Sequence, residues 1–516
     1  MYTSVNKKYS SLCEKRQWFL NRAWDAAEVT IPFILPRNYN LDQDLPTPYQ
    51  GIGARGVNNL AAKLLLTLFP PNSPFFKFQI DDFTLQELQA QRAPIEEGLN
   101  AMERAVMDEV EAKAMRVPLS ECLRHLIITG NCLLHADKNN KVRVFHLDQY
   151  CVRRDPQGEM LEVIVLEKMS RELYKDVFGS SPPNETGTSS DSQEKQLNLY
   201  TVVRRKDNKI HVHQEVNDKK IPNTDSTYPL DKNPWLALRF SAIDGEDYGR
   251  GFVEEYLGDL RALEGLSKAI LEGSAAAARA IFLVRPNGTT KLKTISQAPN
   301  LAVRQGSAED VTVLQMQKFN DFRVAQETIA QTERRLAAAF MLNQSVQRDA
   351  ERVTAEEIRF LANELETTLG GIYSLLSHEL QLPLIKRMIS VLEREKKLPK
   401  LPEGSVEPVI ITGFEALGRG NDANKLATFL QTAAPILGPE AVLTYANPSD
   451  VLKRLGVGFG IDMKGLIKPE EQVQQEQQAQ QQQQMMAQAG LAATPNAVNQ
   501  VGEMVRERQA DGNKTQ

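Results

Sequence analysis

The residues of this sequence that could do chemistry do not combine into a recognisable catalytic site. Residues 51–56 read GIGARG and match the Gly-x-Gly-x-x-Gly pattern of dinucleotide-binding loops. That pattern needs a hydrophobic strand before it, so that a pyrophosphate meets the N-terminus of the following helix. Here the preceding residues 42–50, DQDLPTPYQ, are polar and contain two prolines. We therefore interpret GIGARG as a tight turn that leads into a helix over 55–69.

Histidine and cysteine spacing predicts no metal centre. His211 and His213 lie at i, i+2 on one face of a predicted strand, but no cysteine or carboxylate pattern joins them. We interpret them as an exposed hairpin pair. The four cysteines fit no zinc spacing and are expected to be packing residues. They are Cys13, Cys122, Cys132 and Cys151.

Motifs for phosphate or acyl chemistry are also missing from the sequence. It contains neither the Gly-x₄-Gly-Lys-Ser/Thr loop of nucleotide hydrolases nor a Gly-x-Ser-x-Gly elbow. The carboxylates of Asp244, Glu246 and Asp247 cluster, which is typical of a solvated loop. We therefore expect no catalytic residue, no metal and no cofactor. A sequence-independent DNA-processing enzyme, such as a nuclease, remains the alternative function.

Two arginines stand in a polar break between two predicted helices. The segment 341–353 carries Arg348 and Arg352, with Asp349 and Glu351 between them. A pattern of this kind is equally typical of a solvent-exposed loop and of a loop that binds an anion.

The elements that must position these residues form an α+β pattern that is predominantly helical. Residues 1–131 show mostly helical periodicity, and 132–243 change to the alternation of β-strands. Long amphipathic helices follow, and the last is expected to bend at Gly370-Gly371 and Pro383. These helices are expected over 252–281, 317–340 and 354–397, with a short module containing two β-like runs at 282–316.

Composition and charge exclude several classes of protein. The 516 residues include 61 basic and 66 acidic side chains, a net charge of −5 that argues against a tight DNA binder. No stretch of 18 or more apolar residues occurs, so we expect no membrane span. The N-terminus has no apolar core of a signal peptide. Four cysteines in this length predict a reducing compartment.

Five stretches of the sequence are similar to one known family. They are PYQGIGARGVNNLAAKLLLTLFP at 48–70, DGEDYGRGFVEEYLGDLRALE at 244–264, AFMLNQSVQRDAERVTAEEIRF at 339–360, ELETTLGGIYSLLSHELQLPL at 364–384 and VEPVIITGFEALGRG at 406–420. In this order they resemble the head-to-tail connector, or portal, proteins of short-tailed bacteriophages of the autographivirus type.

The resemblance implies the phage portal fold and a ring of about twelve subunits around an axial channel at one capsid vertex. It implies a wing at 1–251, with a helical part at 1–131 and a β-rich part at 132–243. The other implied parts are stem helices at 252–281 and 317–340, a clip at 282–316, a channel (tunnel) loop at 341–353, a long helix returning to the wing over 354–410, a crown at 411–466 and a Gln-rich, disordered tail at 467–516.

The resemblance also implies which residues face DNA. Twelve copies of Arg348 and Arg352 would ring the channel, as phosphate contacts that carry no sequence information. The other candidates are Asn343, Gln344 and Gln347 on the same surface, and Lys291 and Lys293 at the mouth of the clip. A net charge of −5 per chain becomes about −60 for twelve copies, which repels phosphate and suits a polymer that must slide.

The expected partners follow from the same resemblance. They are other copies of the chain, double-stranded DNA bound without sequence specificity, the terminase large subunit, scaffold and major capsid proteins, and tail adaptor and internal core proteins, with no membrane. We expect the protein in the virion after assembly in the host cytoplasm, where it takes part in capsid assembly, genome packaging and genome ejection. A generic self-assembling scaffold without DNA passage is a further alternative.

Overall fold

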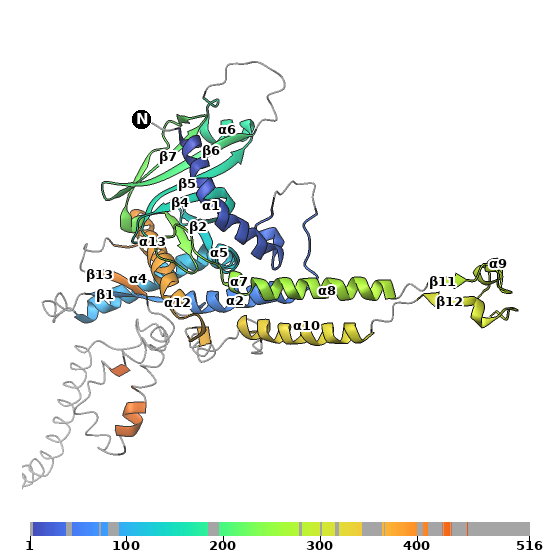
Figure 1. The fold of residues 1–516 in the computed structure, drawn as a ribbon. Helices are drawn as coiled ribbons and strands as arrows, with labels where there is room; N and C mark the ends of the chain where they lie inside the picture. Colours follow the sequence, from blue (N-terminus) through green and yellow to red (C-terminus); the bar gives the residue numbers. More distant parts are fainter. Residues whose placement is uncertain are drawn as a thin grey trace, which may run out of the picture. The chain divides into compact units, whose positions relative to one another are not determined.

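The structure is a computed structural model that divides into two units, Met1–Ala416 and Leu417–Gln516. It describes residues 4–37, 44–71, 74–80, 92–183, 196–277, 281–299, 302–314, 319–342, 364–365, 367–399 and 406–410, with short stretches between 426 and 452. The elements below belong to the first unit, where helices and antiparallel sheets occur together (Figure 1). The predicted α+β class with predominant helix is confirmed. Among the described helices, none is long and apolar enough to cross a membrane.

The helices before residue 130 form one side of the main core. They are α1 (Val5–Glu28), the 3₁₀ helix η1 (Pro32–Ile34), α2 (Ile52–Leu68), α4 (Arg92–Ala112) and α5 (Arg116–Thr129), with strand β1 (Phe76–Ile80) before α4. α2 packs against α5, and Leu60, Leu64 and Leu123 are fully buried. α5 ends at Gly130, whose φ of 74° lies in the left-handed region. A Cβ there would lie 2.3 Å from the backbone of Arg250, so glycine is required.

Antiparallel sheets occupy 131–239, where the sequence predicted strands. One sheet has the order β4-β5-β6-β7-β8 with β9 also paired to β7, and a second has the order β10-β2-β3. The strands are β2 (Asn131–Ala136), β3 (Val142–Phe145), β4 (Tyr150–Arg154), β5 (Met160–Met169), β6 (Leu197–Lys206), β7 (Lys209–Val216), β8 (Lys219–Lys220), β9 (Ser226–Pro229) and β10 (Trp235–Arg239), with 3₁₀ helices η3 (Leu147–Gln149) and η5 (Leu230–Lys232). Asp207 and Asn208, both at positive φ, form the two-residue loop that fixes the register of β6 against β7.

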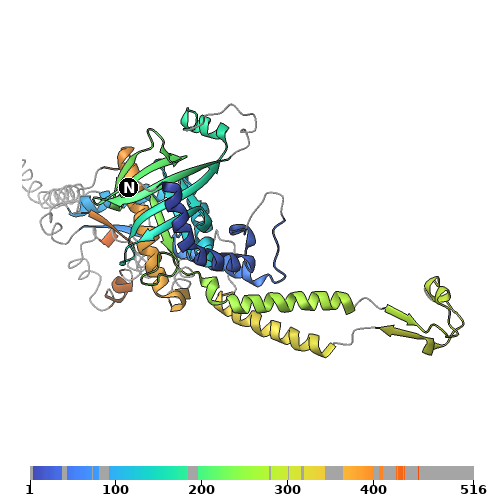
Figure 2. The same cartoon turned by 45° about the horizontal axis from the view of Figure 1, so that its top comes forward.

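One short helix in this region was not predicted from the sequence. α6 (Arg171–Phe178) connects to the end of β5, and Figure 2 shows it beyond the strands. Ser170 caps it, because its hydroxyl accepts the N–H of Leu173 at 3.2 Å. Gly179 ends it in the left-handed conformation.

Two antiparallel helices, α8 and α10, lie side by side and carry a small module (Figures 1 and 2). The elements are α7 (Phe252–Glu255), α8 (Leu257–Ala277), β11 (Ile281–Val284), α9 (Leu292–Ser296), the 3₁₀ helix η6 (Ala308–Asp310), β12 (Val311–Leu314) and α10 (Phe319–Ala339). The single helix expected over 252–281 is therefore divided. The N–H of Tyr256 bonds to the carbonyl of Val253, three residues back, which closes α7 before α8 begins.

The described part of the expected helix over 354–397 is also divided. It contains α12 (Gly371–Leu376), the π-helix η8 (Ser377–Gln381) and α13 (Leu382–Arg394). Gly370 has φ 40° and ψ −110°, so α12 begins anew after it instead of continuing through a bend. Pro383 lies in the first turn of α13, where a missing N–H is tolerated. β13 (Val406–Ile410) then pairs antiparallel with β1.

Candidate functional site

The α8–α10 helix pair is buried at one end and exposed at the other. Leu260 and Leu263 of α8 and Leu336 of α10 are fully buried in the main core. Farther along, Leu271 of α8 is 54% exposed and Val324 of α10 is 62% exposed. The pair is therefore anchored in the main core at the end where α10 finishes.

Close packing at this anchored end explains the glycines of the GIGARG pattern. α2 begins at Ile52, so Gly53 and Gly56 lie inside the helix and not in a turn before it. A Cβ on Gly56 would lie 2.5 Å from the ring of Phe340, the residue after α10. A Cβ on Gly53 would lie 2.6 Å from the carbonyl oxygen of Val29. These glycines allow close packing of the helix. The interpretation of GIGARG as a turn before a helix that starts at residue 55 was therefore wrong, because the helix already begins at Ile52.

The chain leaves α10 through a turn that α2 holds by hydrogen bonds. Met341 has a positive φ of 54°, which reverses the backbone. The Nδ2 of Asn59 donates to the carbonyl of Phe340 at 3.0 Å and to that of Met341 at 3.1 Å. These bonds satisfy carbonyl groups at the C-terminus of α10.

Lys63 of α2 connects the two ends of the segment 343–363. Its Nζ donates to the carbonyl of Met341 at 3.0 Å and lies 3.6 Å from Oε2 of Glu364. Only 6% of the Lys63 side chain is exposed, so this ammonium is stabilised by those two partners instead of by water. The residues just before and just after the segment are therefore held at one point.

Five of the predicted DNA-facing residues lie within that segment. They are Asn343, Gln344, Gln347, Arg348 and Arg352, and all lie outside the described residues. What the structure adds is Lys63, which the sequence analysis did not identify as functional. The sequence did contain a sign of this role. Lys63 lies between Leu60 and Leu64 on the apolar face of the helix, and a lysine in such a place needs a polar partner.

The two lysines predicted at the clip lie on the small module and are exposed. Lys291 immediately precedes α9 and Lys293 lies within it. The turn before them is fixed by Asp310, whose Oδ2 accepts the N–H of Thr290 at 3.0 Å and the hydroxyl of Thr289 at 2.9 Å. These hydrogen bonds hold the pKa of the Asp310 carboxyl below its ordinary value.

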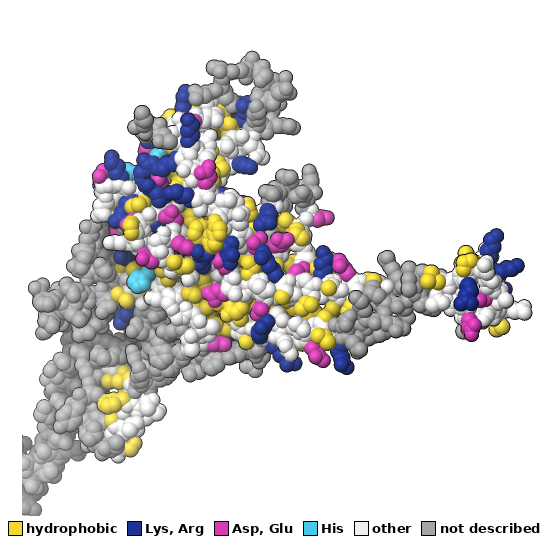
Figure 3. Space-filling view, viewed as in Figure 1, with side chains coloured by type: hydrophobic (Ala, Val, Ile, Leu, Met, Phe, Trp, Pro, Cys, Tyr) yellow, Lys and Arg dark blue, Asp and Glu magenta, His cyan; other side chains and the backbone are white. Residues whose placement is uncertain are grey.

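The module carries more positive charge than its two predicted lysines. Arg285 and Arg304, which the sequence analysis did not select, are also exposed. Against these four cations stand two acidic residues, Glu309 and Asp310, so residues 281–314 carry +2 in a chain of −5. In Figure 3, Lys and Arg side chains stand out at the tip of this module.

The other groups considered for chemistry have structural partners. His213 Nε2 lies 3.0 Å from Glu215 Oε1, and His211 Nδ1 lies 3.3 Å from the hydroxyl of Thr227. The Glu246 carboxylate forms an ion pair with Arg250 at 2.6 Å. Within the described parts of the chain, no group of three His, Cys, Asp or Glu residues is placed to hold a metal ion.

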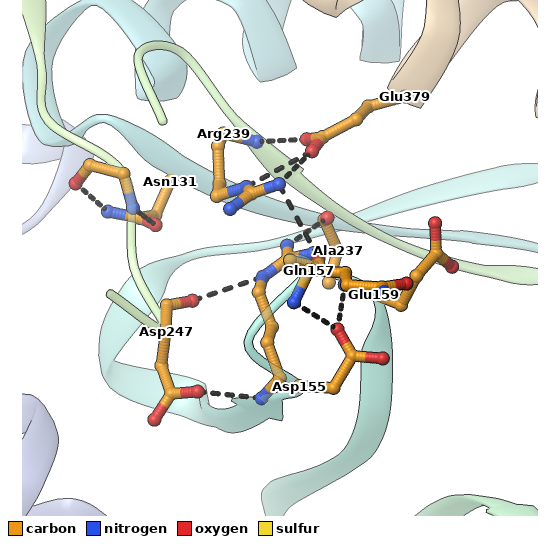
Figure 4. A network of polar contacts seen from close by, with 11 residues as sticks. Asn131, Asp155, Gln157, Glu159, Ala237, Arg239, Asp247 and Glu379 are labelled. Atoms are coloured by element: carbon orange, nitrogen blue, oxygen red, sulfur yellow. Dashed lines mark hydrogen bonds and ion pairs between the residues drawn. The ribbon is translucent and has the colours of Figure 1, made fainter. Parts of the chain in front are cut away.

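A network around buried Arg239 and half-buried Arg154 joins the sheets to the π-helix (Figure 4). Glu379 of η8 accepts the N–H of Arg239 and its Nε, each at 3.0 Å, and its Nη2 at 2.5 Å. The N–H of Arg154 donates to Asp247 at 2.6 Å, and its Nη2 donates to the carbonyl of Ala237 at 2.6 Å. Glu379 matches Arg239 in charge as well as in hydrogen bonds, so this pair fixes the position of the π-helix against β10.

Comparison with known proteins identifies the family. The family model described as "Bacteriophage head to tail connecting protein" matches residues 2–467. The chain belongs to this family. It is 39% identical over 484 residues to the portal protein of Enterobacteria phage T3 and 38% identical over 483 residues to that of Escherichia phage T7, in each case covering 90% of this chain and 88% of the relative. Among solved structures, the neck of a native gene transfer agent (GTA) particle aligns with a TM-score of 0.38 and 12% identity, over 78% of this chain and 89% of that chain.

Membership of this family establishes the general role of the chain. It is a bacteriophage head-to-tail connector, as the resemblance implied, and the fold is that of the connector family. These relatives are structural portal proteins, so the alternative of a nuclease-like enzyme is not supported. A protein that connects head and tail is a component of the virion and has capsid and tail partners.

Proposed function

We propose that the chain forms a ring of about twelve copies around an axial channel, through which double-stranded DNA is packaged and later ejected. Membership of the head-to-tail connector family carries this proposal, and the contacts of Lys63 at both ends of the segment 343–363 support the proposed position of the channel loop. In this proposal the segment between these two anchored ends carries Arg348 and Arg352 to the channel. Contacts of these arginines with phosphates are independent of sequence, and the nearby Asp349 and Glu351 weaken them, so that DNA can move.

The parts of the subunit take the roles that the resemblance implied. In this proposal, 1–251 with 354–410 is the wing, 252–281 and 317–340 are the stem, 282–316 is the clip, 341–353 is the channel loop, 411–466 is the crown and 467–516 is a tail. The exposed apolar residues of α8 and α10 support the assignment of a stem, because side chains such as Leu271 and Val324 need neighbouring copies to cover them.

Charge supports a channel that does not trap its DNA. The clip residues carry +2, which attracts phosphate at the mouth, whereas the whole chain carries −5. Lys291 and Lys293, together with Arg285 and Arg304, would make the first contacts. The net negative charge of the whole ring then repels the DNA inside the channel.

The partners in this proposal are those of a packaging vertex. The ring would nucleate the procapsid with scaffold and major capsid proteins in the host cytoplasm, dock the terminase large subunit, and finally hold the tail adaptor and the internal core proteins. ATP hydrolysis would belong to the terminase, consistent with a sequence that contains no Walker-type phosphate loop.

Imaging of the purified protein tests the ring. Negative-stain images with native mass measurement should show closed rings of about twelve copies with an open centre. A monomer, or a closed particle without a central opening, would contradict the proposal. A monomer that cleaves DNA with a divalent metal would instead support the nuclease alternative.

Charge reversal tests the loop separately from the ring. Arg348→Glu and Arg352→Glu should leave rings intact but lower packaged or retained DNA at least several-fold, because each introduces twelve repulsive charges near the phosphates. Lys219→Glu, an exposed residue of β8, is the matched control and should change neither. Normal packaging and retention in both arginine variants would remove the assignment of these residues.

A further inference from the structure

Two cysteines that are far apart in sequence face each other between α1 and β4. The Sγ atoms of Cys13 and Cys151, 138 positions apart, are separated by 3.4 Å, and both cysteines are free thiols. Cys151 is fully buried in a small apolar cluster with Leu12 and Ile164, whereas Cys13 at the edge of this cluster is partly exposed. One thiol can therefore meet a small reagent from solvent, and the other is placed directly behind it.

A buried arginine lies beside this pair, and no carboxylate among the described residues forms an ion pair with it. Arg16 is 5% exposed, and its Nη1 donates to the carbonyls of Leu147, Asp148 and Tyr150 at 2.9, 2.9 and 2.6 Å. Its Nη2 lies 3.5 Å from Sγ of Cys13. Within the described residues, Arg16 forms no ion pair with Asp or Glu. A thiolate at Cys13 supplies the negative charge that this buried guanidinium otherwise lacks.

The two thiols differ in acidity. The hydrogen bond from the Cys151 thiol, followed by the charge of Arg16, holds the pKa of Cys13 below that of an ordinary thiol. The same hydrogen bond, together with burial, raises the pKa of Cys151. Cys13 is thus suited to attack as a thiolate, and Cys151 stays a protonated thiol behind it.

A second pair of cysteines in the same chain is fully buried and serves as an internal control. Cys122 in α5 and Cys132 in β2 are both fully buried in the main core. Burial raises the pKa of Cys132, and its hydrogen bond with Cys122 raises it further. Neither sulfur of this second pair is accessible to solvent, so peroxide should discriminate between the two pairs.

We propose that Cys13 and Cys151 form a peroxide-reactive dithiol that closes to a disulfide between α1 and the six-stranded sheet. The Cys13 thiolate attacks one oxygen of hydrogen peroxide, the O–O bond breaks, and hydroxide leaves while Cys13 becomes a sulfenic acid. The Cys151 thiol gives its proton to this hydroxide, which leaves as water, and the resulting Cys151 thiolate attacks Cys13 Sγ and displaces a second hydroxide. The second hydroxide takes up the proton that Cys13 had lost, and leaves as the second water. Two thiols are oxidised to one disulfide, and one peroxide is reduced to two waters.

Disulfide formation would matter because the protein is made in a reducing cell and then persists in released virions. The disulfide would close a long loop of the chain, which lowers the conformational entropy of the unfolded state and stabilises the attachment of α1. Assembly would occur with α1 held by packing alone, and oxidation would tighten it afterwards. The chemistry itself depends only on residues of α1, β4 and their neighbours, and not on ring formation or DNA passage.

Peptide mapping of the full chain tests the pair directly. The reduced protein, freed of reductant, is exposed to equimolar hydrogen peroxide and digested without reduction. We expect a cross-linked pair of peptides containing Cys13 and Cys151, with Cys122 and Cys132 still open to alkylation after unfolding. Oxidation of Cys122 or Cys132 as fast as Cys13, or a disulfide that joins Cys13 to another chain, would overturn the proposal.

Variants separate the steps of the reaction. Cys151→Ser should stop at the sulfenic acid of Cys13, which dimedone captures, and Cys13→Ser should abolish the fast phase of peroxide consumption. Arg16→Gln should slow that phase about tenfold at pH 7, because the thiolate fraction falls. If Arg16→Gln does not fold, the pH profile of the dimedone reaction in Cys151→Ser decides, since an ordinary thiol profile contradicts the proposal. Oxidised wild type should also show a higher Tm than reduced wild type, and Cys13→Ser should show no such shift.

Discussion

The main core and the hairpin formed by α8, the small module and α10 are stabilised in different ways. In the core, α2 and α5 bury leucines completely within a single chain. In the hairpin, Leu271 and Val324 are more than half exposed, and Leu292 and Val303 of the module are 65% and 97% exposed. Because apolar area contributes to stability only when it is removed from water, the hairpin depends on a cover that the described residues of one chain do not provide. We therefore expect the core to fold within one chain and the exposed end of the hairpin to be covered on assembly.

The largest expected effect comes from truncating one leucine at each end of α8. Leu263→Ala, at the fully buried end, should lower the free energy of unfolding of the isolated chain by about 3 kcal/mol, since it leaves a cavity. Leu271→Ala, at the exposed end of the same helix, should change it by less than about 0.5 kcal/mol. Urea unfolding of the dissociated chain measures both.

The same two variants also test the role of assembly. Leu271→Ala should weaken ring formation, measured by native mass at decreasing protein concentration, although the chain itself stays stable. Equal destabilisation of the isolated chain by both variants would break the distinction between the two regions.

Acid should affect the core before it affects the hairpin. All six histidines lie outside 257–339, and burial together with the nearby His146 lowers the pKa of His125 from 6.5 to about 3. Below pH 6.5, His125 becomes protonated in the unfolded chain but stays neutral in the folded chain. The free energy of unfolding therefore falls as the pH drops. By pH 4 this one residue costs about 3 kcal/mol.

Chemical denaturation at a series of pH values checks this expectation. In His125→Phe, the loss of stability between pH 6.5 and pH 4 should be smaller than in wild type. His378→Gln changes an exposed histidine of the π-helix and should show the same loss of stability between pH 6.5 and pH 4 as wild type. A wild-type stability that stays constant from pH 6.5 to pH 4 would contradict the role given to His125.

Removing the ammonium at the junction of core and hairpin should have an intermediate effect. Lys63→Met keeps the length of the side chain but leaves the carbonyl of Met341 and the carboxylate of Glu364 without their shared partner. We expect a loss of about 2 kcal/mol in the free energy of unfolding, with faster amide exchange near residue 341. Lys77→Met on the exposed side of β1 is the control. Unchanged exchange around the junction would argue against anchoring by Lys63.

The smallest effect is expected in the small module. Asp310→Asn removes a charged acceptor from Thr289 and Thr290, so amide exchange should rise around 288–293 without a change in global stability. Because the pKa of Asp310 is lowered in the folded chain, its contribution is present above the ordinary value of 3.8 and is lost as the pH falls through the lowered value. The wild-type module should therefore loosen only below about pH 4, and the Asn variant should show no such step.

Local patterns predicted the elements better than the contacts between them. The apolar spacing in α10 and the alternation in β5 to β7 identified those elements, because helix and strand periods are properties of neighbouring residues. The breaks at Tyr256 and Gly370 depend on particular backbone conformations that periodicity does not report. Lys63 was missed because its two partners lie hundreds of residues away in sequence. The loop residues Arg348 and Arg352 stay predictions, since they lie outside the described residues.

The junction at Lys63 also has a consequence for how this protein can change. Met341 and Glu364, which flank 343–363, meet at one ammonium, and the entropic cost of closing a chain segment grows only slowly with its length. An insertion or deletion within 343–363 should therefore add little to the cost of closing this segment. We expect such changes to be tolerated as long as the buried lysine and the packing around it stay the same.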